Sequence, residues 1–431
     1  MTDASRILNS RPLAALASIG DNAYLSSVRA GMVAIVPLTI VGGLFMIVAF
    51  LPVSGWDAKV APYLPLLQVP VTATFGLLAV VACFSIAWDL GARLGQEPAV
   101  SGATALVVFM LLQVDPSTQT VTMDGLGSKG LFTAILVAIV SARTLRFFTD
   151  RQLVIRMPPS VPAVVSQSFV SLTPLCFLVL AFWLVRFVLH VDPNALLQAA
   201  FAPLVFALNT LPGILAYASL VTILWSIGIN GDNAVDAVVA PIFLQYLAAN
   251  VEATTAGAPL PYVTAYGFFT TFVNVGGTGA TIALALLLAR SKEPGYRRIA
   301  RVSLPTQIFQ INEPIFFGLP IVMNPVFMIP YVLNALLLTT GTYLLMQWEI
   351  VHKPFINVPW TTPPVVGHYL VTGGDWRAAA WGAASIPIAM LVYLPFARAA
   401  ERQRLSEVAD SAGESCRKRA PGQQQATRED K

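Results

Sequence analysis

The chain contains long apolar stretches that carry almost no charge, and this feature limits its possible folds more than any other. Only 11% of its 431 residues are charged, whereas soluble proteins of this size carry about a quarter charged residues. The last 34 residues alone hold 14 of the 48 charged side chains. The pattern excludes a soluble globule, a disordered protein and a nucleic-acid binder. Because the apolar stretches are continuous and not alternating, they predict an all-α polytopic membrane protein.

Ten stretches are long enough to be candidate membrane spans, since about 20 apolar residues cross a bilayer. We therefore expect ten transmembrane helices, at residues 31–51, 71–90, 99–112, 131–147, 165–189, 214–229, 235–249, 266–288, 326–346 and 378–396. The stretches at 99–112 and 235–249 are short for a full crossing. A polar-interrupted stretch at 194–209 predicts an amphipathic helix that lies at the membrane interface.

Two further apolar segments contain too many prolines to be simple helical crossings. Residues 304–324 contain three prolines, a glycine and the central pair Asn312-Glu313, and residues 358–375 contain three prolines and a Gly-Gly pair. Proline removes a backbone donor and breaks helices. Broken backbone is tolerated at membrane depth only where protein or a water-filled cavity satisfies it. We interpret both segments as re-entrant hairpins that line a solute pathway.

Basic residues cluster after alternate spans, and the loops between those clusters hold few charges. If both proline-rich segments are re-entrant, every basic cluster falls on one side of the membrane. The positive-inside rule then predicts that both termini are cytoplasmic. Residues 398–431 are polar and poor in apolar side chains, so we expect a disordered tail. The three cysteines and three histidines show no metal-ligand spacing, and we expect neither a metal nor a cofactor.

Glu313 is the most informative residue, because an ionisable side chain inside an apolar segment is costly unless it is hydrated or paired. We predict a functional role for it, and the alternative is a carboxyl group that only ties the hairpin together. Asn230, Gly231, Asp232 and Asn233 form a polar break between two apolar helices, with Asp236 one turn later. Helix capping and substrate binding explain this break equally well.

Two more motifs carry side chains that suit a sugar. The glycine-rich stretch from Asn274 to Thr281 would let backbone approach a ligand closely, although small residues in membranes also serve helix packing. Trp360, Thr361 and Thr362 offer an aromatic face and hydroxyl groups to a sugar ring. The alternative for a tryptophan is a place in the interfacial belt.

These motifs together resemble a known family. INEPIFFGLPIVMNP (residues 311–325) and VPWTTPPVVGHYLVTGGDWR (358–377) resemble signature segments of the membrane-embedded IIC subunit of the lactose/cellobiose/diacetylchitobiose class of bacterial sugar phosphotransferase systems. The segments NAYLSSVRAGMVAIVPLTIVGG, ILWSIGINGDN and GGTGAT match as well. The resemblance covers roughly residues 10 to 400, and the two longest motifs are highly specific.

The resemblance implies a homodimeric permease in the bacterial cell membrane. Residues 1–30 would form a cytoplasmic N-terminal segment, 31–190 the scaffold and dimer interface, 191–210 a connector and 211–397 the substrate-binding transport domain. Such a subunit binds a sugar, carries it inward by alternating access and presents the C6 hydroxyl to the phosphocysteine of a soluble IIB protein. No soluble cysteine-bearing domain is present in this sequence, so phosphorylated IIB would act in trans.

The resemblance also assigns roles to residues. The glutamate that contacts the reacting hydroxyl maps to Glu313, and the tryptophan that contacts the sugar maps to Trp360. Family members commonly have Gly-Ile-His-Gly where this chain has Asn230 as the third residue, and asparagine cannot take up a proton near neutral pH. Gln310 stands where asparagine is usual. The full set of expected sugar-binding residues is Asn230, Asp232, Asn233, Asn274, Gly277, Asn312, Glu313, Trp360, Thr361 and Thr362.

Other functions fit part of the pattern. A proton-coupled secondary sugar transporter would use Glu313, Asp232 and Asp236 as a proton relay, and needs no IIB protein. A membrane-embedded enzyme would need a metal cluster or a nucleophile–base pair, and the sequence shows neither. A regulatory sugar sensor would use the tail as its output. The specific sugar is not readable from one sequence, because it depends on which hydroxyl groups find partners.

Overall fold

The computed structural model describes residues 22–50, 55–155, 158, 163–319 and 321–425. Within these residues the chain is helical, and the only strand-like pairing is a single bridge between Val114 and Val121. The expected all-α architecture is thereby confirmed for this part of the chain. The ends of the predicted N-terminal segment and tail, residues 1–21 and 426–431, lie outside the described residues.

The N-terminal half forms one group of helices. Its long helices are α3 (Ala23–Ala49), α5 (Leu64–Phe75), α6 (Leu78–Arg93), α7 (Pro98–Leu112), α8 (Leu131–Asp150) and α9 (Ala163–Trp183), and α4 (Trp56–Val60) and several single turns connect them. Helix α6 is central and packs against α3, α7 and α8. Small residues permit this close packing: a Cβ atom at Gly31 of α3 would lie 2.1 Å from Cγ1 of Ile86 on α6.

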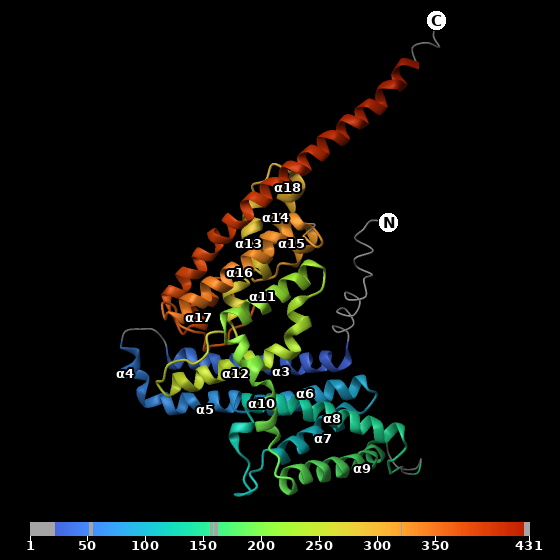
Figure 1. The fold of residues 1–431 in the computed structure, drawn as a ribbon, viewed down its shortest axis with the longest axis vertical. Coiled ribbons are helices and arrows are strands. Elements are labelled where there is room, and N and C mark those ends of the chain that lie inside the picture. The colour runs from blue at the N-terminus through green and yellow to red at the C-terminus, as the bar shows by residue number, and fades with distance from the viewer. Residues whose placement is uncertain (1–21, 51–54, 156–157, 159–162, 320, 426–431) are drawn as a thin grey trace.

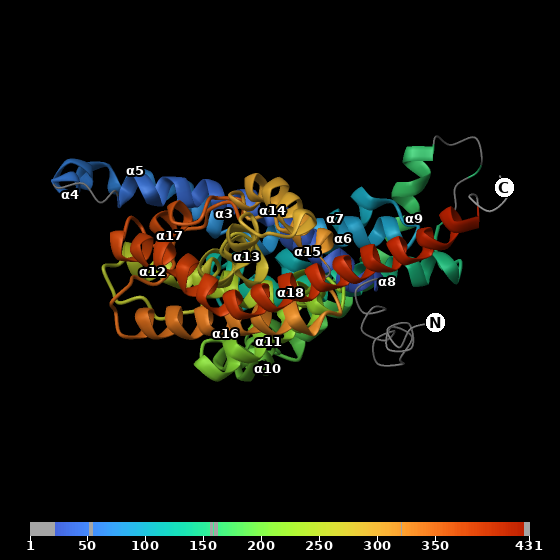
Figure 2. The ribbon, with the colours of Figure 1, turned by 90° about the horizontal axis from the view of Figure 1, so that it is seen from above.

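The C-terminal half forms a second group, most of which lies above the first (Figure 1). It contains α10 (Pro193–Leu208), α11 (Leu211–Ser226), α12 (Gly231–Thr255), η5 (Phe268–Val273), α13 (Thr281–Leu288), α14 (Pro294–Gln307), α15 (Glu313–Gly318), α16 (Pro325–Gln347), α17 (Val366–Val371) and α18 (Trp376–Gln425). Helix α16 packs between α11 and α18 (Figure 2). Helices α10 and α12 lie alongside the N-terminal helices (Figure 1). Helix α12 contacts α3 and so joins the two groups.

The described residues contain eight helical stretches that are long and apolar enough to span a membrane, or nine if one bent pair is a single span. Ten were expected. The stretch at 99–112 is α7, a 15-residue apolar helix that is too short to qualify. The expected interfacial helix at 194–209 is α10, which meets α11 at an angle of 86°. These two helices form the bent pair.

Both proline-rich segments have broken backbone, as expected. In the first, α14 ends at Gln307 and the six-residue helix α15 begins at Glu313. In the second, an irregular turn leads into the six-residue helix α17. The tail differs from the expectation of disorder, because α18 continues without interruption to Gln425 and projects beyond the other helices (Figure 1). The charged residues of the tail do not prevent helix formation, since most of them are good helix formers.

Candidate substrate site

The polar break between α11 and α12 is a helix cap that also holds a carboxylate. Asn230 is the N-cap of α12, and its side-chain oxygen accepts a 2.9 Å hydrogen bond from the backbone N–H of Asn233. The amide nitrogen of Asn230 donates to no described residue and is only partly buried. Helix capping therefore explains the role of the side-chain oxygen of Asn230, while its side-chain nitrogen stays free to donate a hydrogen bond. Asn233 itself is exposed.

Asp232, in the first turn of α12, links three segments of the chain. Its Oδ2 atom accepts a 2.8 Å hydrogen bond from the indole N–H of Trp225 on α11. The same oxygen accepts a 3.3 Å hydrogen bond from the hydroxyl of Thr278 in the glycine-rich stretch. The position suits a carboxylate, because the first turn of a 25-residue helix favours negative charge.

The glycine-rich stretch forms a cradle of backbone N–H groups, and a side chain from the first proline-rich segment occupies it. Gly276 and Gly277 both have positive φ angles, of 71° and 104°, a conformation that glycine adopts without strain. Successive N–H groups in such a turn converge on one acceptor. Here the acceptor is Oε1 of Gln310, at 2.8 Å from the nitrogen of Gly276 and 3.3 Å from that of Gly277. The N–H of Gly277 is therefore engaged within the protein.

Asn312 completes this contact between the two segments. It is 5% exposed, and its side-chain nitrogen donates a 3.1 Å hydrogen bond to the carbonyl oxygen of Thr278. A Cβ atom at Gly277 would lie 2.4 Å from Cβ of Asn312, so only glycine fits there. Asn274, at the end of η5, is also buried, and its side-chain oxygen has no hydrogen-bond partner among the described residues.

Glu313 follows Asn312 directly but has a different environment. It is the first residue of α15, its side chain is exposed, and no described residue donates a hydrogen bond to its carboxylate. The cost of an unpaired carboxylate inside protein is avoided by this exposure. The structure thus offers a free carboxylate beside a firmly held asparagine.

The second proline-rich segment presents its aromatic residue outward. Trp360 is 56% exposed. The backbone N–H and the hydroxyl of Thr362 both donate to the carbonyl oxygen of Pro359, at 2.9 and 2.6 Å, which closes a tight turn around Trp360 and Thr361. This turn packs near η5, because a Cβ atom at Gly367 would lie 3.1 Å from Thr271 and 3.7 Å from Thr362.

The structure therefore joins some predicted site residues and leaves others apart. Hydrogen bonds and packing link Asp232, Gly277 and Asn312 into one network, while no hydrogen bond connects Glu313 with Trp360 among the described residues. Three members of the network were not among the residues predicted from the sequence: Trp225, Thr278 and Gln310. Gln310 was visible in the sequence only as an unusual residue, and Trp225 and Thr278 gave no separate signal.

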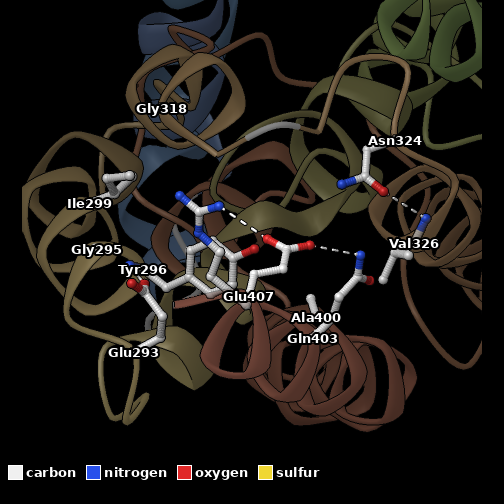
Figure 3. A pocket seen from close by; sticks show the side chains of 11 residues that line it. Glu293, Gly295, Tyr296, Ile299, Gly318, Asn324, Val326, Ala400, Gln403 and Glu407 are labelled. Carbon is white, nitrogen blue, oxygen red and sulfur yellow. Dashed lines mark hydrogen bonds and ion pairs between the residues drawn. The ribbon is translucent and has the colours of Figure 1, made fainter. Parts of the chain in front are cut away.

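A cavity of about 340 Å³ lies elsewhere, between α14, the segment leading into α16, and α18 (Figure 3). It contains none of the predicted site residues. Its charged groups are already paired: Glu407 forms a 3.1 Å ion pair with Arg404 and accepts a hydrogen bond from Gln403, and Glu293 accepts one from the N–H of Tyr296. Nor do the described residues contain three or more His, Cys, Asp or Glu side chains grouped as metal ligands would be.

Comparisons with known proteins identify the class. Residues 29–335 match the family model of the phosphotransferase system EIIC domain. The lichenan permease IIC component of Bacillus subtilis (strain 168) is 35% identical over 95% of this chain and 96% of its own length. The cellobiose-specific EIIC component of Geobacillus stearothermophilus is 34% identical over 93% of this chain and 95% of its own length.

A solved structure agrees with the sequence relatives. ChbC, the IIC component of an N,N'-diacetylchitobiose-specific phosphotransferase system, superposes with a TM-score of 0.87 at 31% identity, over 94% of this chain and 99% of that one. The chain belongs to the EIIC family. It is a multi-pass, membrane-embedded sugar permease subunit of the lactose/cellobiose/diacetylchitobiose class.

Proposed function

We propose that this subunit binds a β-linked disaccharide of the cellobiose, diacetylchitobiose or lactose kind and carries it inward by alternating access. Phosphorylated IIB, acting in trans, then phosphorylates the C6 hydroxyl of the sugar. The names of the relatives support this substrate class, and so does the exposed indole of Trp360 with the hydroxyl groups beside it. The charged product no longer fits a neutral-sugar site and stays inside.

The observation that carries the proposal is the contrast between Asn312 and Glu313. Asn312 is fixed to the glycine-rich stretch, whereas the adjacent carboxylate is free and exposed. A free carboxylate accepts a hydrogen bond from a sugar hydroxyl without first breaking a bond within the protein. Asn230, with its unused amide donor, and Asn274, with its unpaired oxygen, would bind further hydroxyl groups.

Glu313 has a defined task in the transfer step. As the new bond forms between the C6 oxygen and phosphorus, the bond between phosphorus and the cysteine sulfur of IIB breaks, and the sulfur leaves as a thiolate. The hydroxyl proton passes to the carboxylate of Glu313. A carboxylate in this role orients the nucleophile and removes its proton in the same step.

The same proposal includes the assembly and topology. We infer a homodimer formed by the N-terminal group of helices, with both termini in the cytoplasm. Exposed apolar side chains along α9, among them Leu172, Phe177 and Leu180, suit either a second copy or lipid. The basic residues after α8 and around α14 support a cytoplasmic location for these loops.

The test is sugar uptake into vesicles that contain the full chain, with and without phosphorylated IIB, across a panel of β-disaccharides. Accumulation of sugar phosphate only when phosphorylated IIB is present would support the proposal. Uptake of unmodified sugar driven by a pH gradient would instead indicate a proton-coupled transporter. Binding of none of the sugars in the panel would overturn the proposed substrate class.

A further inference from the structure

The turn that follows Trp360 contains a strained residue. Val365 has φ 69° and ψ −55°, a conformation that is rare for any residue with a side chain and most unfavourable for a β-branched one. The N–H of Val366 donates a 2.8 Å hydrogen bond to the carbonyl oxygen of Pro364, which closes a γ-turn of the uncommon positive-φ type. Strain of this kind persists only where the surroundings impose it.

His368 supplies the hydrogen bond that holds this turn. The N–H of Val365 donates to Nδ1 of His368 at 3.3 Å. The side chain of His368 is completely buried. Because Nδ1 acts as an acceptor, the neutral ring carries its proton on Nε2, and Nε2 has no partner among the described residues. A buried donor without a hydrogen-bond partner is uncommon in proteins and lowers their stability. The buried position of the His368 ring is therefore energetically unfavourable in this respect.

Two neighbours fix the ring of His368 in place. Phe272 of η5 packs edge-on against it, with ring centres 4.5 Å apart. Helix α18 also approaches the ring closely at Gly382, where a Cβ atom would lie 2.6 Å from the imidazole ring. The position of Nδ1 is thus set by two separate elements, and both are packed against the segment that carries Trp360.

We propose that His368 is a positioning residue that holds the turn at residues 359–367 in the conformation that presents Trp360 and its threonines to the sugar. The inference rests on the proposed function, because it assigns this turn to the sugar site. The chain of contacts is continuous: His368 bonds Val365, Gly367 donates a 2.9 Å hydrogen bond to the carbonyl of Pro363, and Thr362 closes the turn on Pro359.

Two substitutions distinguish the effect of the hydrogen bond between Val365 and His368 from the effect of the volume that the His368 ring fills. In His368→Asn the side-chain oxygen lies near the place of Nδ1 and can still accept from Val365. In His368→Gln the amide group lies near the place of Nε2 and leaves the N–H of Val365 without an acceptor. Both variants lose the ring contact with Phe272, so each is the control for the other.

Sugar binding to the purified full chain is the first measurement, because it needs no IIB protein. Losing one hydrogen bond that fixes a binding turn should raise Kd about tenfold in His368→Gln, while His368→Asn should stay near the wild-type value. Adding Val365→Gly to His368→Gln should recover most of the affinity, since glycine adopts positive φ without strain. Uptake with phosphorylated IIB should show a raised KM and an unchanged rate at saturating sugar.

The outcomes are distinguishable. The inference would be overturned if His368→Gln and His368→Asn lost sugar affinity equally and Val365→Gly restored none of it. That result would show that His368 only fills space. If His368→Gln does not fold, His368→Asn and Val365→Gly as single variants still test it: both should bind sugar with near wild-type affinity, and a loss in both would contradict the role. Failure of the wild-type chain to bind any sugar in the panel would overturn the proposed function itself.

Discussion

Asn357 donates a 2.7 Å hydrogen bond from its side-chain nitrogen to the hydroxyl oxygen of Thr39, joining residues that are 318 positions apart in the chain. Both side chains are buried. A Cβ atom at Gly43, one turn further along α3, would lie 2.7 Å from the carbonyl oxygen of Asn357. The segment that leads into the Trp360 turn therefore rests directly on α3 of the N-terminal group. If the two groups move during transport, this contact is one that must change.

Replacing Thr39 by valine tests how much this contact stabilises the protein. The shape is kept, but the amide nitrogen of Asn357 loses its acceptor, so Thr39→Val should destabilise the fold by about 1–3 kcal/mol. Thermal unfolding in detergent would measure the effect. Thr340→Val is the control, because the hydroxyl of Thr340 bonds only to its own helix, and it should shift stability by less than about 0.5 kcal/mol. Equal shifts in both variants would contradict the prediction.

Much of the helical architecture could be predicted from the sequence, because uncharged apolar length is a direct signal for a membrane helix. The broken backbone near Glu313 and Trp360 could also be predicted, from proline density. Two features could not. The helix at 294–307 carries several arginines and resembles a loop in composition, and the continuation of α18 beyond residue 398 has no apolar pattern to mark it.

The candidate site was only partly predictable for a different reason. Asn312, Glu313 and Trp360 belong to motifs whose composition is unusual in an apolar segment, so they are recognisable one by one. The hydrogen bonds from Gly276 and Gly277 to Gln310 connect positions more than thirty residues apart. The packing of the two segments determines which side chain lies against the N–H groups of Gly276 and Gly277. A single sequence does not show how distant segments pack.

Gln310 and Gln307 provide a matched pair for testing the cradle. Both are buried, but Gln310 accepts two backbone hydrogen bonds, whereas neither polar atom of the Gln307 side chain has a partner among the described residues. Gln310→Met should leave two N–H groups unpaired and destabilise the fold by about 2 kcal/mol or more. Gln307→Met removes only unsatisfied groups and should be neutral or stabilising. Thermal unfolding of both variants is the measurement. A larger loss of stability in Gln307→Met than in Gln310→Met would refute the role of Gln310 as the acceptor of the cradle.

Gly277→Ala should be among the most damaging small substitutions in the chain. The new methyl group would meet Asn312 at 2.4 Å, and the backbone φ of 104° is unfavourable for alanine. We expect the free energy of unfolding to fall by about 3 kcal/mol or more in a thermal unfolding experiment, and sugar binding to be lost. Gly257→Ala separates the two causes, because Gly257 also has positive φ but nothing lies within 4 Å of its Cβ position. Gly257→Ala should lower the free energy of unfolding by only about 1–2 kcal/mol. If both variants lost the same stability, the contact with Asn312 would be unimportant.

Asp375 should make stability depend on pH at the start of α18. Burial acts to raise the pKa of its carboxyl group, but the hydrogen bonds from Arg377 and from the N–H of His352 outweigh it, so the pKa lies below its usual value. A depressed pKa stabilises the fold above the unfolded-state pKa of about 3.9, and this stabilisation is lost as the pH falls through the folded-state value. Unfolding of the wild-type chain and Asp375→Asn between neutral and acid pH is the measurement.

The expected result is that Asp375→Asn is about 1 kcal/mol less stable at neutral pH, as for the loss of a charged helix cap. Its stability should also fall less steeply in acid than that of the wild-type chain. The exposed carboxylate of Asp124 serves as a comparison, and Asp124→Asn should leave the acid dependence close to wild type. Parallel acid curves for Asp375→Asn and the wild-type chain would show that this carboxyl group does not govern the transition.

Glu313→Gln tests the proposed chemistry most directly. Glutamine keeps the size and one acceptor oxygen but cannot remove a proton, so transfer from phosphorylated IIB should fall at least about 100-fold. Sugar binding should weaken less, by no more than about tenfold, because a hydrogen bond to the hydroxyl is still possible. Glu349→Gln, an exposed glutamate just beyond the end of α16, is the control and should behave as wild type. Equal and mild losses of binding and transfer in Glu313→Gln would remove Glu313 from the catalytic step and leave it a binding residue.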